Sequence, residues 1–196
     1  MIKSSLRVIF LSVLAFTGIS VLAQDIPAAS RGDLEVGATF SFASPHLQGT
    51  ITGTNIPWPD HTIWGGSIYA NLNFTDNLSL SAQFDYPTYH TPDDYLEKSY
   101  LLGLRYTHPV RERYVPYVKV LAGIASTSYD KPTNWITVPG TPGTYGAIAF
   151  GGGLDIRLAH RITVRAIDFQ LEDWPGFPGG TITPSIISIG AAYRIR

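Results

Sequence analysis

The sequence contains few side chains whose type and spacing could support catalysis. Asp60-His61 and Asp93-Asp94 are the kinds of pair that can activate a water molecule for hydrolysis. Adjacent residues of an extended segment point to opposite sides, however, so neither pair is placed to act on one water. His108 and His160 fall in expected short turns and not on a strand beside a serine, which disfavours a histidine-activated serine nucleophile.

The sequence supports a site for a metal, a phosphate or a nucleic acid no better than it supports a catalytic site. The chain has no cysteine, and none of its five histidines forms an i, i+2 or i, i+4 pair. The run Gly151-Gly152-Gly153 lacks the Lys-Ser/Thr and the helix of a phosphate-binding loop. A formal net charge of −1 provides no basic excess for binding nucleic acid. We therefore expect a protein without a catalytic site, a metal or a cofactor.

The first 23 residues have the three parts of a secretory signal peptide. Lys3 and Arg7 provide the positive start, residues 8–21 are mostly apolar, and Val21-Leu22-Ala23 provides a cleavage site. The apolar stretch is too short to span a membrane, and no later run approaches the ~20 residues that a transmembrane helix needs. We predict export, cleavage after Ala23, and a single domain in residues 24–196.

The rest of the chain alternates between apolar and polar residues in eight segments, which is typical of strands with one apolar and one polar face. In the second segment, for example, Trp64, Ile68 and Leu72 share one side, whereas Ser67 and Asn71 share the other. The eight segments are residues 34–42, 64–74, 78–86, 99–106, 116–126, 147–158, 161–172 and 186–196.

The connections between these segments alternate between short and long. The short ones are residues 75–77, 107–114 and 159–160, and the long ones are 43–62, 87–97, 127–144 and 174–184. Transmembrane barrels show this alternation of connection lengths, with tight periplasmic turns and larger external loops. Strands of about ten residues also match the apolar band, which is about 25 Å tall. The sequence thus predicts an all-β fold, an eight-stranded antiparallel up-and-down transmembrane β-barrel.

The seventh segment interrupts its own alternation. Continued strictly from Val164, the pattern would turn Asp168 and Glu172 toward lipid, which is unfavourable by about 1–3 kcal/mol for each carboxylate. A β-bulge near Ala166-Ile167 shifts the register by one residue and turns Ile167, Phe169 and Leu171 outward instead. We predict a bulge at this position.

The polar faces of the eight segments predict what fills the barrel. An eight-stranded barrel has an interior only wide enough for side chains, so opposite charges there must pair. We expect inward glycines such as Gly37 and Gly153 to let Tyr69 and Tyr117 lie across the strand. The predicted polar network of the lumen is Glu35, Asp85, Arg105, Lys119, Asp155, Arg157, Arg165, Asp168 and Glu172. The predicted aromatic residues at the membrane interfaces are Trp64, Phe74, Tyr86, Tyr106, Trp174 and Tyr193.

Together these features resemble the outer-membrane β-barrel-domain family of small barrels like the transmembrane domain of outer-membrane protein A. Residues 114–125, 147–157 and 162–170 carry the resemblance. It implies a bacterial outer-membrane location, contact with outer-membrane lipid, insertion by the barrel-assembly machinery and a periplasmic N-terminus.

The favoured functional hypothesis is a monomeric, non-enzymatic structural or surface protein with a lumen filled by side chains. Its external loops, which contain Trp58 and Trp135, are candidates for binding a partner. Three alternatives stay open: a narrow pore for small solutes, an outer-membrane lipid-modifying hydrolase, and a soluble exported barrel that binds a ligand.

Overall fold

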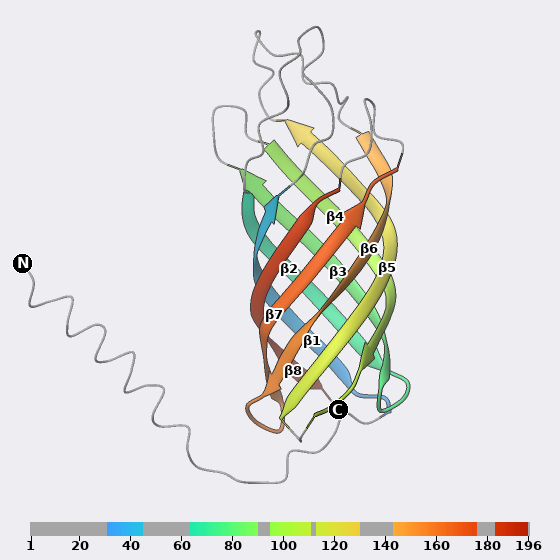
Figure 1. The fold of residues 1–196 in the computed structure, drawn as a ribbon, viewed down its shortest axis with the longest axis vertical. Coiled ribbons are helices and arrows are strands. Elements are labelled where there is room, and N and C mark those ends of the chain that lie inside the picture. The colour runs from blue at the N-terminus through green and yellow to red at the C-terminus, as the bar shows by residue number, and fades with distance from the viewer. Residues whose placement is uncertain are drawn as a thin grey trace, which may run out of the picture.

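A computed structural model describes residues 31–44, 63–89, 95–110, 113–129, 143–175 and 183–195, which form a closed antiparallel β-barrel of eight strands (Figure 1). Each strand pairs with its neighbours in the chain, and the last pairs with the first. The strands are β1 (Leu34–Ser44), β2 (Ile63–Asn73), β3 (Leu78–Tyr89), β4 (Tyr95–Thr107), β5 (Tyr114–Tyr129), β6 (Gly143–Arg157), β7 (Ile162–Asp173) and β8 (Ser185–Ile195). The predicted fold is confirmed, whereas the expected signal peptide lies outside the described residues.

The two faces of the sheet follow the alternation of the sequence. On β1, Val36, Phe40 and Phe42 are 42–50% exposed on the outer surface, whereas Glu35 and Ser41 are buried inside. In water this arrangement would expose large apolar side chains over the whole barrel and bury charged ones. Surrounded by lipid, it satisfies both faces, as in other transmembrane barrels.

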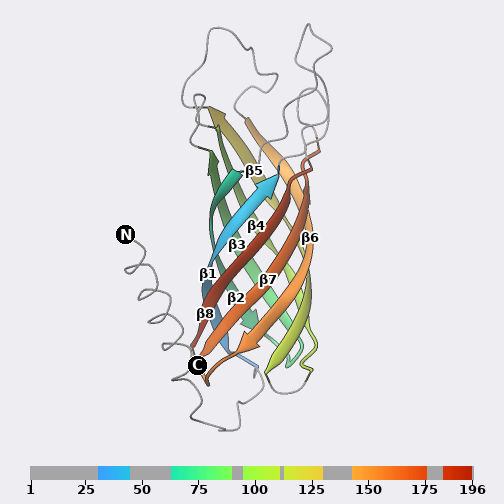
Figure 2. The same ribbon diagram turned by 60° about the vertical axis from the view of Figure 1, so that its left-hand side comes forward.

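The short connections lie at one end of the barrel, as Figures 1 and 2 show. In the turn of residues 74–77, the Thr75 hydroxyl accepts hydrogen bonds from the backbone N–H groups of Asn77 and Leu78, at 3.3 and 2.9 Å. In the turn of residues 158–161, the backbone N–H of Leu158 donates to the carbonyl of Ile162. The same end holds the start of β1 and the end of β8, where Leu34 pairs with Ile195.

Four strands, β3, β4, β5 and β6, extend three or four residues further at the opposite end than the alternation of the sequence predicts. β4, β5 and β6 contain 13, 16 and 15 residues, whereas β1, β2 and β8 each contain 11. The extra length comes from residues assigned to loops, because the β4–β5 ladder continues through Glu97 and Thr127. Glu97 is consequently an inward strand residue and is only 2% exposed.

The bulge predicted in β7 is confirmed. Leu154 of β6 pairs with Ile167, but the next residue, Asp155, pairs with Arg165, so Ala166 has no partner across the ladder. The register against β8 shifts over the same residues. As a result Ile167 is exposed on the outer face, and Asp168 is buried inside.

Candidate functional site

All nine residues predicted for the polar network lie inside the barrel. They come from six strands, and each is between 2% and 6% exposed. Charged groups buried this deeply are tolerated only when they are paired and hydrogen-bonded, so their partners determine what the interior can do.

The network is organised around the carboxylate of Asp155, in the half of the lumen that is nearer the short connections. This carboxylate forms an ion pair with a terminal nitrogen of Arg105 and accepts a hydrogen bond from Nε of Arg165 at 3.0 Å. The guanidinium of Arg105 also lies 3.7 Å from the carboxylate of Glu35, which accepts a hydrogen bond from Asn71 at 3.1 Å. One carboxylate thus pairs with two arginines that come from opposite sides of β6 in the sheet order.

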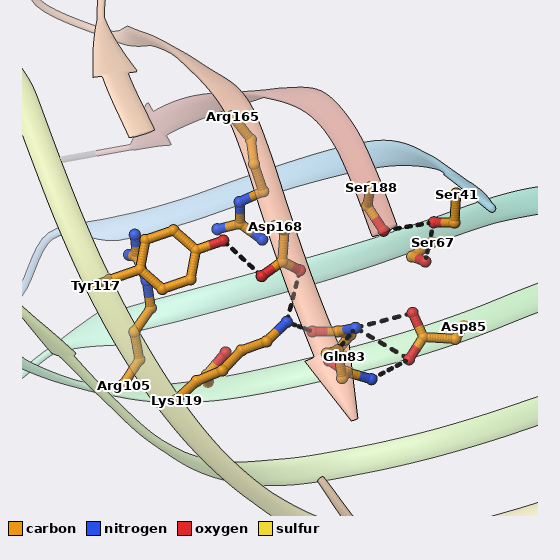
Figure 3. A network of polar contacts seen from close by, with 12 residues as sticks. Ser41, Ser67, Gln83, Asp85, Arg105, Tyr117, Lys119, Arg165, Asp168 and Ser188 are labelled. Atoms are coloured by element: carbon orange, nitrogen blue, oxygen red, sulfur yellow. Dashed lines mark hydrogen bonds and ion pairs between the residues drawn. The ribbon is translucent and has the colours of Figure 1, made fainter. Parts of the chain in front are cut away.

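Two tyrosine rings alternate with two guanidinium groups next to this cluster. The guanidinium carbon of Arg165 lies 3.7 Å from the ring centroid of Tyr69 and 4.9 Å from that of Tyr117. Arg105 lies 4.1 Å from the Tyr117 ring, and Figure 3 shows Arg105 and Arg165 beside it. Such contacts stabilise a desolvated cation by about 2 kcal/mol. The four side chains form what we call the Tyr–Arg stack.

Both tyrosines lie across glycines of the neighbouring strand, as the sequence analysis predicts. Tyr69 pairs with Gly37, where a Cβ atom would be 2.4 Å from the Cζ atom of the tyrosine ring. Tyr117 pairs with Gly153, where a Cβ atom would be 2.8 Å from the tyrosine hydroxyl. The absent side chains therefore leave the space that each ring occupies.

A second set of contacts continues from the stack toward the external end (Figure 3). Asp168 accepts hydrogen bonds from the Tyr117 hydroxyl and from the Lys119 ammonium, both at 2.7 Å. Lys119 also donates to Gln83, whose amide donates to Asp85 at 2.8 Å. The bulge in β7 is what places Asp168 within reach of these donors.

Trp174 corrects one prediction. It is predicted to lie at a membrane interface, but its side chain is 1% exposed inside the barrel. There its Nε1 donates a hydrogen bond to the Glu172 carboxylate at 2.7 Å. It packs in an apolar cluster with Leu101 and Leu121. The reason is the register shift, since after the bulge the even-numbered residues of β7 face inward.

The other predicted interface aromatics point away from the lumen. Trp64, Tyr86, Tyr106 and Tyr193 are each 39–48% exposed on the outer surface. Phe74 is half-buried in the turn that follows β2. Their contact with the membrane interfaces stays a prediction.

The structure adds interior residues that the predicted network leaves out. Arg194 is 4% exposed, and its Nε lies 4.0 Å from the carboxylate of Asp33. Gln83 and Gln170 join Asp85 to Glu172 through their side-chain amides. Arg194, Gln83 and Gln170 follow from the same two-residue periodicity as the predicted network, whereas Asp33 precedes the first alternating segment.

Within the described ranges, no group of three His, Asp or Glu side chains could hold a metal ion. His108 and His160 are exposed in the connections that follow β4 and β6. In the same part of the chain, no helix is long and apolar enough to span a membrane. The chemistry that the described interior offers is therefore ion pairing and hydrogen bonding.

A closed sheet with an apolar outer surface and a polar interior defines the class of membrane-spanning β-barrels. The family model described as outer membrane protein beta-barrel domain matches residues 11–194, and the chain belongs to this family. The protein is accordingly a protein of the bacterial outer membrane. No curated protein sequence matches the chain.

Several solved structures share this fold. The outer membrane protein OprG from Pseudomonas aeruginosa aligns with a TM-score of 0.60 at 13% identity, over 88% of this chain and 100% of OprG. Neisserial surface protein A aligns with a TM-score of 0.59 at 12% identity, over 85% and 97% of the two chains. Ail, the attachment invasion locus protein of Yersinia pestis, aligns with a TM-score of 0.55 at 13% identity, over 84% and 99%.

Proposed function

We propose that this protein is a non-enzymatic structural and surface protein of the outer membrane whose lumen is sealed by its own side chains. The observation that supports this proposal is the Tyr–Arg stack, in which Tyr69, Arg165, Tyr117 and Arg105 follow one another at ring-to-cation distances of 3.7–4.9 Å. Barrels of eight strands have interiors only wide enough to be filled in this way.

The cavity at the periplasmic end of the lumen supports the same proposal. It is lined by Glu35, Arg105, Asp155, Arg157 and Arg194 among others, and its volume is about 20 Å³. That volume holds about one water molecule. A hydrated ion would have to displace both the buried ion pairs and the Tyr–Arg stack to move further.

Planar-bilayer recordings test the seal. We expect the full-length protein to give no reproducible conductance steps, whereas the double variant Tyr69→Ala/Tyr117→Ala should give discrete ones. The double substitution removes both rings of the stack but leaves every buried ion pair in place. Tyr106→Ala is the matched control, because Tyr106 faces outward and is 48% exposed. Heat-dependent gel migration checks that each variant is folded, and reproducible steps from the unaltered protein would refute the proposal.

The surface role that we propose centres on residues 130–142, which connect β5 to β6. β5 and β6 contain 16 and 15 residues. At about 3.3 Å per residue and a tilt of about 40°, each strand covers about 40 Å along the barrel axis, well beyond an apolar band of about 25 Å. The two strands would therefore carry this connection, which contains Trp135, away from the membrane surface. Among the structural neighbours, Ail is named as an attachment protein and has been crystallised with a heparin analogue.

Replacing residues 130–142 by an Asn-Gly turn should reduce adhesion of cells that express the protein several-fold, because the candidate contact surface is removed while both strands are kept. The matched control replaces residues 90–94, which connect β3 to β4, by the same turn. Surface levels are equalised by antibody labelling before adhesion is counted. Unchanged adhesion in the first variant would rule out this role for residues 130–142.

A further inference from the structure

The outer surface of the barrel carries an apolar trough over β2 to β5. Its volume is about 490 Å³, and its floor contains three alanines, Ala70, Ala82 and Ala122. Ala70 pairs with Ala82, and Leu102 pairs with both Ala82 and Ala122. The row across the four strands is therefore Ala70, Ala82, Leu102 and Ala122, and the small side chains on β2, β3 and β5 leave the surface hollow on either side of Leu102.

A row of larger side chains borders the trough on its external side. Ile68, Phe84, Tyr100 and Ile124 are in register on the same four strands. The Phe84 and Tyr100 rings stack with their centroids 4.6 Å apart. Together the two rows make a continuous apolar groove that faces lipid.

The trough covers the outer leaflet of the membrane. Ala82 is four residues from Leu78, the periplasmic end of β3, and Ile124 is ten residues from Tyr114, the periplasmic end of β5. At about 3.3 Å per residue and a tilt of about 40°, these positions lie about 10 Å and about 25 Å above the periplasmic ends of the strands. The middle of an apolar band about 25 Å tall lies at about 12 Å, so the trough covers the range of an acyl chain in the outer leaflet and also reaches a few ångströms below the middle.

A cation lies at the external edge of the trough. The Lys98 ammonium is 5.2 Å from the centroid of the Tyr86 ring, and Lys98 points outward because Glu97 and Ser99 on either side are buried inside. Lys98 is nine residues from Thr107, so at about 3.3 Å per residue and a tilt of about 40° it lies about 23 Å above the periplasmic end of β4. That height is where the acyl chains of the outer leaflet meet their phosphorylated headgroups.

We propose that the trough and Lys98 together bind one molecule of the phosphorylated, acylated glycolipid of the outer leaflet. An acyl chain occupies the trough against the alanines, and the Lys98 ammonium pairs with a phosphate of the headgroup. This inference goes beyond the proposed function, since it concerns the outer face of the barrel and holds whether or not the lumen conducts.

Titration of purified lipid A into the full-length protein in nonionic micelles, followed by native mass spectrometry, tests the proposal. We expect one tightly bound lipid A per barrel. Ala82→Trp, which fills the trough, and Lys98→Gln, which removes the charge, should each weaken binding at least about fivefold, which corresponds to about 1 kcal/mol. The unaltered protein should bind lipid A without its phosphates as weakly as the Lys98→Gln variant binds intact lipid A.

Two variants and one lipid serve as controls. Lys98→Arg keeps the charge and should bind as the unaltered protein does. Ala191→Trp adds the same side chain on the outer face of β8, outside the trough, and should also leave binding unchanged. Phosphatidylglycerol, which is anionic but lacks the glycolipid headgroup, should bind at least fivefold more weakly than lipid A.

Three results would each overturn the proposal: full affinity in Ala82→Trp, an equal loss in Ala191→Trp, or equal binding of phosphatidylglycerol. Heat-dependent gel migration verifies that every variant is folded before the titration. If Ala82→Trp fails this check, Ala122→Leu narrows the same trough from β5 and replaces it in the comparison.

Discussion

Replacing Asp155 by Ala should lower the free energy of unfolding by about 3–5 kcal/mol, because it leaves two buried arginines without their shared carboxylate. Arg105 keeps only the carboxylate of Glu35 at 3.7 Å, and the Nε of Arg165 loses its hydrogen-bond partner. Both arginines also stack on tyrosines, so their side chains cannot leave the lumen without disrupting the Tyr–Arg stack. Urea unfolding in lipid vesicles, followed by tryptophan fluorescence, measures the loss.

Asp76→Ala is the matched control for this measurement. Asp76 is exposed in the turn between β2 and β3, where substitutions usually change stability by no more than about 0.5 kcal/mol. The double variant Asp155→Ala/Arg165→Ala should recover part of the loss, because one of the two uncompensated charges is then removed. A loss below about 1 kcal/mol in the single variant would contradict the central role of Asp155.

A second large effect is expected at a single glycine of β6. Gly153→Ala should destabilise the barrel by about 1–3 kcal/mol, the usual effect of overpacking a filled interior. The new Cβ atom would lie 2.1 Å from the backbone carbonyl oxygen of Ile167 and 2.8 Å from the Tyr117 hydroxyl. Ile167 belongs to the bulge and Tyr117 to the Tyr–Arg stack, so neither can move without losing contacts. The same unfolding measurement applies.

Gly146 provides the comparison on the same strand. A Cβ atom at this position would meet nothing within 4 Å, and the backbone is not in the positive-φ region. Gly146→Ala should therefore leave stability unchanged or raise it by up to about 1 kcal/mol, since alanine restricts the unfolded chain. Equal losses at both glycines would contradict the inference that the close approach at Gly153 sets the cost.

The alternation of side chains made the fold, the inward face of the nine predicted lumen residues and the bulge in β7 predictable. The bulge could be located because Asp168 and Glu172 would otherwise face lipid, which is a large and specific penalty. Trp174 was misplaced because it was assigned by residue type, although the shifted alternation already turned it inward. Consistent use of the periodicity would have placed it correctly.

Two other features could not be read from periodicity. The external ends of β4, β5 and β6 lie beyond the apolar band, where both faces of a strand can be polar and the alternation loses contrast. Periodicity also assigns a face but no partner. Arg165 pairs with Asp155 across adjacent strands, whereas Arg105 comes from two strands away and reaches Asp155 only through the curvature of the closed sheet.

The pairing of β1 with β8 has a consequence for how the protein folds. The Ser41 hydroxyl bonds to Ser67 on the next strand and also to Ser188, which is 147 positions further along the chain. β1 can therefore complete its pairing only when β8 is in place. Contacts between residues so far apart in the sequence give a high contact order, which slows folding. Until β8 arrives, an inserted sheet would expose both its edge N–H groups and its interior charges to lipid. Membrane entry and ring closure must then proceed together, so only a chain that already contains residues 185–195 can complete its insertion.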